Sequence, residues 1–245
     1  MSSSVKFMLG RREIRGVICD LDGTLVDSAE DLRAALNVVM RRAGLRQIAP
    51  DEIRAMIGDG VPKLVERGLD AAGGDSGDAA SLVPEFLTVY EANPTAHTRC
   101  YPGVVRTLAA LKDRQCKLAV VTNKPAVAAQ KILRQLSIAD FFAAVVGGDS
   151  LPERKPHPAP LLEAARQLSL PTSDLLMVGD NIHDIEAARA AGIQSVAVTY
   201  GYHHRSPSSF GASHLINRFA DLMSLIDMST DVADNQSSGV VISFF

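Results

Sequence analysis

The sequence predicts an α/β fold: a parallel sheet covered by helices on both faces, with an all-helical segment inserted after the first strand. Short apolar runs alternate with segments of helical periodicity, a pattern typical of parallel sheets built from strand–helix–strand units. Polar residues directly follow these runs, at the strand ends where such sheets bind ligands. The gap between the first run and the second is far longer than a crossover connection, which indicates the insertion.

The expected strands are short apolar runs that are followed or closed by Gly, Asp, Thr or Asn. They lie at 14–19, 118–122, 143–146, 175–178 and 195–198, with a weaker one at 214–216. Because helical periodicity follows most of these runs, the helices cover both faces of the sheet. The sequence therefore predicts a Rossmann-like core of three layers.

The first expected strand ends in two carboxylates, since Asp20 and Asp22 follow it with one residue between them. Two acids this close repel each other, so both ionise readily only beside a cation. Gly23 and Thr24 come next and offer a tight turn whose backbone N–H groups suit a phosphate. The pattern indicates a divalent metal site with a carboxylate nucleophile beside an acid/base. The alternative is an ordinary turn, because Asp-Gly pairs are common in turns.

The residues after the first motif predict a second, all-helical domain. Ser28 and Asp31 have the spacing of a capping box, which predicts that a helix starts there. Apolar residues between Leu32 and Met40 then recur at helical spacing. Further helical segments are expected at 50–56, 61–69 and 79–93, with a loop at 73–78. We therefore expect a helical domain at 28–98 and a discontinuous core at 1–27 and 99–228.

The last residues differ in composition from the rest of the chain. The stretch 231–238 is polar and turn-like, and 240–245 is apolar. We expect a disordered tail at 229–245. Its apolar end is either a terminus without function or a segment that pairs with a sheet edge or a partner.

Composition and charge narrow the classes of partner. The net charge of −3 comes without a cluster of Lys and Arg, which argues against nucleic acid. No apolar run approaches the ~20 residues that span a bilayer, and the basic residues near the N-terminus follow an apolar patch, the wrong order for a secretory signal. The three cysteines lack metal-site spacing, so we expect a reducing cytoplasm. Monomer and dimer both stay open.

Later strand ends carry further candidates for phosphate chemistry. Thr122 and Asn123 close the second strand and can bind phosphate oxygens, or they simply end the strand. Lys155 precedes Pro156, which holds it in an extended loop where its charge can offset a transferring phosphoryl group; the alternative is a solvated lysine. Asp180 and Asp184 follow the 175–178 strand. We expect Asp180 to be a metal ligand and Asp184 to be a second ligand or an orienting group. The alternative is that Asp180 caps a helix.

Taken together, these segments resemble the four motifs of the haloacid dehalogenase-like hydrolases. The matching segments are Asp20-x-Asp22-Gly23-Thr24, Thr122-Asn123, Lys155-Pro156 and Gly179-Asp180-x3-Asp184. The helical insertion resembles the cap domain of that superfamily. Its dehalogenases and phosphonatases lack the second acid of the first motif, so Asp22 favours a phosphatase or a phosphomutase.

Other segments resemble the bacterial phosphoglycolate phosphatase family within that superfamily. They lie at 101–104, 122–125, 147–152, 155–161 and 199–202, and the likeness runs from about residue 15 to 226. Asn181 stands where that family usually has Ser. The resemblance implies hydrolysis of a small phosphorylated metabolite, first of all 2-phosphoglycolate. A phosphatase of a sugar phosphate, such as N-acetylmuramate 6-phosphate, and a phosphomutase are the alternatives. A binding protein without activity is disfavoured, because the charged residues of the chemistry are all present.

The resemblance also implies a role for each motif residue. Asp20 is the nucleophile that forms an aspartyl-phosphate, and Asp22 is the acid/base. Mg²⁺ is held by Asp20, by the backbone carbonyl of Asp22 and by Asp180, with Asp184 as an orienting neighbour. The phosphoryl group is held by Thr122, Asn123 and Lys155.

The helical insertion contains one candidate for substrate choice. Gly58, Asp59 and Gly60 form an expected turn, and Lys63 lies in the first turn of the next helix. We expect Lys63 to bind the carboxylate of phosphoglycolate, assisted by the helix N-terminus. The alternative is a solvated lysine, with the segment 202–205 as the next candidate.

Overall fold

The computed structural model describes residues 7–10, 12–203 and 205–227. Its centre is a six-stranded sheet in the order β10-β9-β8-β3-β6-β7, and all neighbouring strands in it are parallel. The predicted α/β class is therefore confirmed. The tail expected to be disordered, 229–245, lies outside the described residues.

The strands of this sheet lie close to the predicted runs. Their bounds are β3 Gly16–Cys19, β6 Lys117–Val121, β7 Ala144–Val146, β8 Leu175–Gly179, β9 Gln194–Val198 and β10 His214–Ile216. Every residue of β3 is buried, as expected for a central parallel strand with both faces covered.

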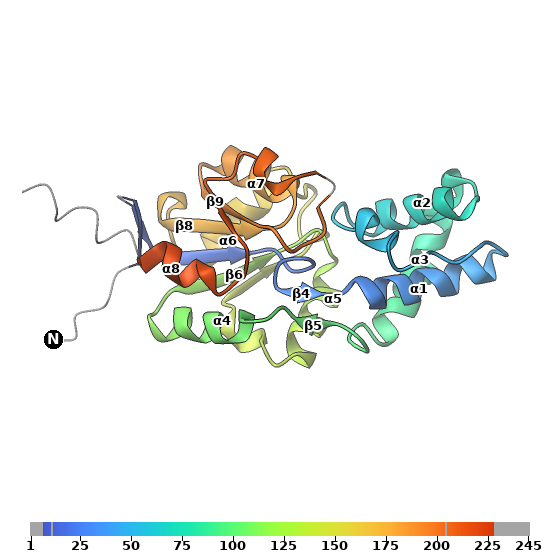
Figure 1. The fold of residues 1–245 in the computed structure, drawn as a ribbon, viewed down its shortest axis with the longest axis horizontal. Coiled ribbons are helices and arrows are strands. Elements are labelled where there is room, and N and C mark those ends of the chain that lie inside the picture. The colour runs from blue at the N-terminus through green and yellow to red at the C-terminus, as the bar shows by residue number, and fades with distance from the viewer. Residues whose placement is uncertain (1–6, 11, 204, 228–245) are drawn as a thin grey trace, which may run out of the picture.

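Helices cover the two faces of the sheet, and neighbouring residues of β3 belong to different faces. Val17 and Cys19 pack in the larger core cluster with residues of α4 (Val104–Asp113), α5 (Ala126–Gln135) and α8 (Asp221–Asp227). Ile18 packs in a second cluster with residues of α6 (Ala159–Leu168) and α7 (Ile182–Ala191). Figure 1 shows α7 above and α4 below the sheet. The core thus has the three layers that the sequence predicted.

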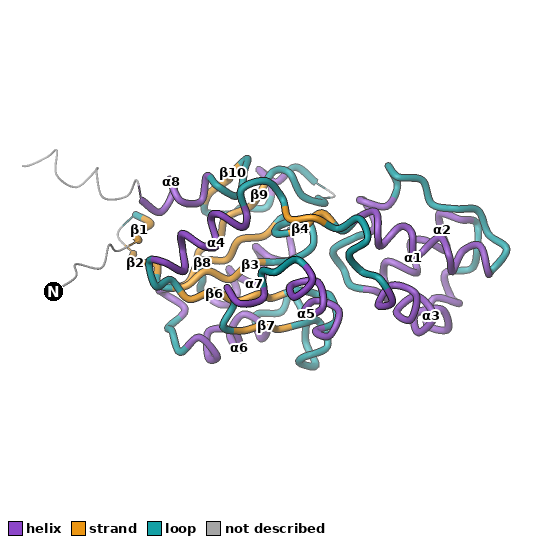
Figure 2. Tube along the Cα trace, turned by 90° about the horizontal axis from the view of Figure 1, so that it is seen from below, coloured by secondary structure: helices purple, strands orange, loops and turns teal. Residues whose placement is uncertain are grey.

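The insertion contains three α-helices and is connected to the core by a short ribbon. The helices are α1 Ala29–Arg42, α2 Val61–Ala72 and α3 Ala79–Ala92. They follow β4 (Val26–Asp27) and precede β5 (Arg99–Cys100), and these two strands pair antiparallel. Figures 1 and 2 show the helices together beyond one end of the sheet, the end to which β3 runs. We therefore keep 28–98 as the proposed boundaries of the cap.

A hairpin at the start of the chain corrects the first predicted strand. Ile14 belongs to β2 (Arg12–Ile14), which pairs antiparallel with β1 (Phe7–Leu9), so 14–19 is not one strand. The sheet strand begins at Gly16, where an added Cβ would lie 2.6 Å from the side chain of Leu175. A neighbouring strand thus comes close to Gly16, where glycine leaves room for it.

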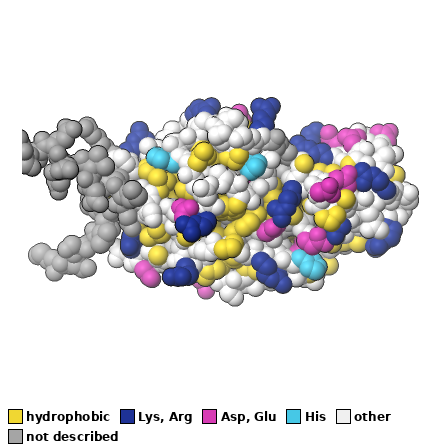
Figure 3. Space-filling model, in the orientation of Figure 1, with side chains coloured by type: hydrophobic (Ala, Val, Ile, Leu, Met, Phe, Trp, Pro, Cys, Tyr) yellow, Lys and Arg dark blue, Asp and Glu magenta, His cyan; other side chains and the backbone are white. Residues whose placement is uncertain are grey.

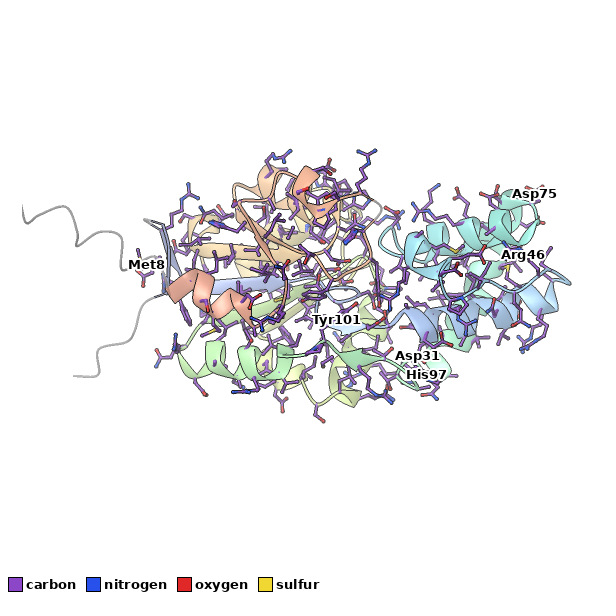
Figure 4. The ribbon with its side chains drawn as sticks, in the orientation of Figure 1. Met8, Asp31, Arg46, Asp75, His97 and Tyr101 are labelled. Atoms are coloured by element: carbon purple, nitrogen blue, oxygen red, sulfur yellow. The ribbon has the colours of Figure 1, made fainter. Side chains whose placement is uncertain are left out.

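The predicted capping box at Ser28 does not form, although α1 begins there. The Ser28 hydroxyl donates to Asp22 Oδ1 at 2.5 Å. The carboxylate of Asp31 instead accepts hydrogen bonds from the backbone N–H of His97, at 3.0 Å, and from the backbone and hydroxyl of Thr98. Figure 4 labels Asp31 and His97 beside each other where the chain returns to the core. The contacts of Asp31 are long-range, and the partner of Ser28 lies six residues earlier, outside the helix that the local pattern predicted.

Two further expectations in the insertion are corrected. The segment 50–56 forms a 3₁₀ helix only at Ile53–Met56, because the Glu52 carboxylate accepts from Arg46 and from the backbone of Ala49 and holds a turn there. The segment 73–78 contains a 3₁₀ turn at Ser76–Asp78, capped by Asp75. The remaining 3₁₀ helices are Ala139–Phe141, Thr172–Asp174 and Pro207–Ser209.

The surface of the described residues carries charges of both signs. On the face drawn in Figure 3, Lys and Arg side chains are scattered among Asp and Glu rather than gathered in one area. Among the described residues, the helices are too short or too polar to cross a membrane.

Candidate active site

The site lies where the sheet reverses its strand order. β3 sits between β8 and β6, so the connections on its two sides run in opposite directions, and ligands bind at such switch points beyond the carboxyl ends of the strands. Asp20 follows β3, Thr122 follows β6 and Asp180 follows β8. All three side chains are buried. The sheet topology thus brings together residues from distant parts of the sequence.

Lys155 is the central cation of the site. Its ammonium donates to Asp20 Oδ1 at 2.7 Å, to Asp184 Oδ1 at 2.6 Å and to the carbonyl of Val121 at 2.6 Å. These acceptors use all three donors of a lysine. Burial by itself lowers the pKa of Lys155, but the charges of Asp184 and Asp20 outweigh it and raise the pKa above its usual value. Lys155 is therefore charged, and it is held by the expected nucleophile and the orienting acid.

Three buried carboxylates form a group that suits a metal ion. One oxygen from each of Asp20, Asp180 and Asp184 lies within 4.8 Å of the others. Burial raises the pKa of Asp20 to about 6, and the Lys155 charge offsets this only in part. Burial, followed by the charges of Asp20 and Asp184, raises the pKa of Asp180 well above its usual value. Negative charge is thus in excess, and oxygen donors of this kind fit a hard divalent cation such as Mg²⁺.

Asp184 is already bound on both of its oxygens. Oδ1 accepts from Lys155 and Oδ2 accepts from the backbone N–H of Asn181 at 3.0 Å. Asn181 in turn caps α7, since its side chain accepts from the backbone of His183. Ser and Asn are both good N-cap residues, so the Asn181 departure from the family pattern preserves this local function. Asp184 fits an orienting role, and Asp20 and Asp180 fit the ligand roles.

Asp22 has two side-chain partners. Besides the Ser28 hydroxyl, it accepts from the ammonium of Lys124, which lies 2.9 Å from Oδ2 and 3.2 Å from Oδ1. Lys124 is 6% exposed and stands in the 122–125 segment. The sequence predicted no role for Lys124, although the 122–125 segment carries part of the family resemblance. Its position next to Thr122 and Asn123 is the sequence feature that could have indicated a role in the site.

Gly23 and Thr24 form a turn beside the acids. The N–H of Gly23 donates to Val26 and that of Thr24 to Leu21, so both N–H groups close the turn, and their binding of a phosphate stays a prediction. The Thr24 hydroxyl donates to Asp180 Oδ1 at 2.9 Å. Gly23 has φ +87, and an added Cβ would lie 2.2 Å from Asp180. The turn therefore makes room for Asp180 and holds it in place.

Thr122 and Asn123 line the cavity as expected. The Thr122 hydroxyl oxygen accepts from the backbone N–H of Lys124 at 3.2 Å, and its own proton stays available for a ligand. The Asn123 amide donates to the carbonyls of Gly58 and Lys155 at 3.1 and 3.0 Å. Its Oδ1 is buried and has no hydrogen-bond partner among the described residues. Asn123 thus links the core to the loop between α1 and α2.

That loop is held to the core by a second contact. The Asp59 carboxylate pairs with His183 at the start of α7 and with Arg67 of α2. The hydrogen bond with His183 lowers the pKa of Asp59 and raises the pKa of His183. The loop 58–60 therefore lies against the loops that follow β6 and β8.

Tyr202, from the segment 202–205, connects the Asp180 site to the start of the cap. Its backbone N–H donates to Asp180 Oδ2 at 2.7 Å. Its hydroxyl donates to Asp27 Oδ1 and accepts from the backbone N–H groups of Ser28 and Ala29. The sequence pattern did not reveal this connection. His204 lies outside the described residues.

Lys63 is not brought to the site. Its ammonium pairs with Glu66 on the same helix at 2.7 Å, and its side chain is 51% exposed. It is absent from the described lining of the cavity. The structure therefore does not join Lys63 to the other expected site residues.

The cavity between core and cap is small, about 40 Å³. One wall is polar and the other is mostly apolar. The core contributes Asp20, Asp22, Thr122, Asn123 and Lys124, and the cap contributes Leu32, Ile57, Gly58, Gly60, Val61 and Leu64. An adjoining cavity reaches Lys155 and Asp180. The two cavities are thus lined by acidic side chains and by the ammonium groups of Lys124 and Lys155, and the cap wall suits a small organic group.

Comparisons with known proteins agree with this geometry. Residues 17–198 match the model of the family described as haloacid dehalogenase-like hydrolase. A phosphoglycolate phosphatase of Nitrosococcus oceani is 41% identical over 191 residues, which cover 77% of this chain and 85% of the relative. One of Chromobacterium violaceum is 38% identical over 222 residues, which cover 88% and 97%.

A solved structure shows the same fold. A Haemophilus somnus protein, described as a predicted phosphoglycolate phosphatase, has a TM-score of 0.82 and 35% sequence identity. The alignment covers 86% of this chain and 97% of that one. The resemblance found in the sequence is therefore confirmed. The chain is an enzyme that belongs to the haloacid dehalogenase-like hydrolase family.

Proposed function

We propose that the chain is a Mg²⁺-dependent phosphatase of small phosphomonoesters and that 2-phosphoglycolate is its preferred substrate. The observation that carries this proposal is the pairing of Asp20 with Lys155 and of Asp22 with Lys124 around one cavity. The first acid lies beside a group of buried carboxylates, as a nucleophile next to a metal requires. The second is separate from that group, as an acid/base requires. The names of the relatives support the substrate.

The reaction runs in two steps on the side chains of the core. Asp20 attacks the phosphorus, the bond to the ester oxygen breaks, and Asp22 gives its proton to the departing oxygen. Asp22 then takes a proton from water, whose oxygen attacks the aspartyl-phosphate and frees both phosphate and Asp20. Lys155 holds Asp20 Oδ1 at 2.7 Å, which leaves Oδ2 for the attack.

The remaining groups of the site neutralise and orient the phosphoryl group. Asp20, Asp180 and the backbone carbonyl of Asp22 would hold Mg²⁺, whose charge would offset the buried negative charge and polarise a phosphoryl oxygen. Thr122 binds another oxygen through its hydroxyl and Asn123 through its backbone N–H, while the charge of Lys155 offsets the negative charge of the phosphoryl group. Positioning and electrostatic stabilisation of this kind supply most of the catalysis of phosphoryl transfer.

The cap wall of the cavity favours a small substrate. Its side chains are Leu32, Ile57, Val61 and Leu64, all buried. Sugar hydroxyls placed against them would lose hydrogen bonds to water without replacement, which costs free energy. The small cavity and this apolar wall therefore support phosphoglycolate over a sugar phosphate.

The cellular setting is part of the proposal. Cys19, Cys100 and Cys116 are free thiols, which supports the expected cytoplasmic location. The proposed partner is a small phosphorylated metabolite, and neither nucleic acid nor membrane is an expected partner.

A panel of phosphorylated metabolites assayed with Mg²⁺ tests the proposal. We expect phosphate release from 2-phosphoglycolate with a higher kcat/KM than from N-acetylmuramate 6-phosphate or other sugar phosphates, measured by phosphate detection. Excess chelator should abolish the release, and Ca²⁺ should restore it poorly because its coordination shell is larger and looser. A higher kcat/KM for a sugar phosphate would refute 2-phosphoglycolate as the preferred substrate. Transfer of the phosphoryl group to a sugar in place of water would indicate a phosphomutase, and absence of turnover would indicate a binding protein.

A further inference from the structure

We propose that Lys124, rather than Lys63, binds the carboxylate of the substrate and thereby sets the preference of the enzyme for phosphorylated hydroxy acids. This inference rests on the proposed phosphatase function and names the residue that selects its substrate. It depends on the position of Lys124 beside Asp22, on the charges that line the cavity, and on a contact from the cap.

Lys124 has a donor to spare at the cavity. It lines the cavity, and its ammonium donates to the carboxylate of Asp22. An ammonium has three donors, and this one donates to the two oxygens of a single group. Lys124 therefore presents a charged donor where a ligand binds.

The chemistry of the substrate places its carboxylate beside Asp22. Asp22 must be within hydrogen-bond distance of the ester oxygen to protonate it. In phosphoglycolate a single methylene joins this oxygen to the carboxylate carbon. The carboxylate thus lies within a few bond lengths of Asp22, and Lys124 lies 2.9 Å from the Asp22 carboxylate. The reacting geometry therefore brings carboxylate and ammonium together.

Other cations do not serve this position. Among the described residues that line the cavity, Lys124 alone carries positive charge. Lys155, in the adjoining cavity, has its three donors taken by Asp20, Asp184 and Val121. The cap wall beyond Asp22 is mostly apolar. A substrate carboxylate placed there without Lys124 would be buried without a partner, which is strongly unfavourable.

A tyrosine from the cap holds Lys124 in place. The ammonium lies 4.6 Å from the ring centre of Tyr90 on α3, within the range of a cation–π contact. Tyr90 is 2% exposed, and its hydroxyl has no hydrogen-bond partner among the described residues. Tyr90 therefore covers the Lys124 ammonium from the side of the cap. Tyr90 makes the carboxylate site depend on both core and cap.

The test compares two substrates that differ in the carboxylate, 2-phosphoglycolate and ethyl phosphate. Lys124→Met removes the partner of Asp22 for both, so both lose activity, and the ratio of their kcat/KM values isolates the carboxylate. We expect this ratio to fall about 10- to 100-fold, the range for one charge-assisted hydrogen bond. Lys124→Arg keeps the ion pair with Asp22 but moves the donors, so it should fold and also lower the ratio.

Lys112→Met serves as the matched control, because Lys112 lies on α4 and donates to the carbonyl of Asp140. It should leave the ratio unchanged. An unchanged ratio in Lys124→Arg, or a fall in the ratio in Lys63→Met alone, would overturn the inference. Equal losses on both substrates in a folded Lys124→Met would do the same while leaving the phosphatase function intact. Absence of phosphate release by the wild-type enzyme from either substrate would instead refute the proposed function, and the inference with it.

Discussion

Replacement of Asp20 by Asn is expected to lower phosphate release at least about 10⁴-fold, the scale of losing a covalent nucleophile in other enzymes. Asn cannot form the phosphorylated carboxylate, and its neutral amide is a poor metal ligand. The chain should still fold, because Asn has nearly the same shape and Lys155 keeps its bonds to Asp184 and Val121. Steady-state phosphate release and circular dichroism of the variant measure the two effects.

Covalent trapping assigns the role of Asp20 directly. Beryllium fluoride, or rapid quenching with labelled substrate, should mark Asp20 in the wild-type enzyme. Asp22→Asn is the matched control: it removes the acid/base, typically a loss of ~10²–10⁴-fold, but leaves the nucleophile, so Asp20 should still be marked. A label mapped to Asp22 or Asp180 would contradict the assignment.

Replacement of Lys155 by Met should have the largest effect on stability. Lys155 is 4% exposed and faces two carboxylates that are themselves buried. Its removal leaves Asp20 and Asp184 close together without their cation, and breaking a buried pair in this way costs about 3–5 kcal/mol. We expect the free energy of unfolding, from urea titration, to fall by that amount, and phosphate release to be lost.

A double variant distinguishes uncompensated charge from simple loss of packing. Asp184→Asn combined with Lys155→Met removes one of the two stranded charges and should recover part of the lost stability. Lys63→Met is the surface control, since the pair with Glu66 is exposed and such pairs contribute ~0–1 kcal/mol. Equal losses of stability in Lys155→Met and in the double variant would show that the buried charges do not determine the effect.

The sequence was most informative where the signal is local. Runs of buried residues revealed the sheet strands, because a central parallel strand must be apolar on both faces. The polar residues after these runs revealed Asp20, Thr122 and Asp180, because parallel strands end at one edge. Strand boundaries that depend on contacts between distant segments could not be predicted from the sequence alone. Ile14 pairs with Phe7 in the hairpin, and the apolar run 14–19 does not contain that partner.

The sequence by itself determined the α/β class, because periodicity expresses it within a few residues, and the resemblance of its short motifs to a known family identified the family and the motif residues. Only the tertiary structure decided which side chains meet. Lys124 and Asp22 are 102 residues apart, and Ser28 serves Asp22 rather than its own helix. Lys63 has the charge that the substrate needs, but α2 turns it towards Glu66 and solvent. The sequence gives the charge of a side chain directly, but its hydrogen-bond or ion-pair partner depends on how the helices, strands and loops pack in the folded chain.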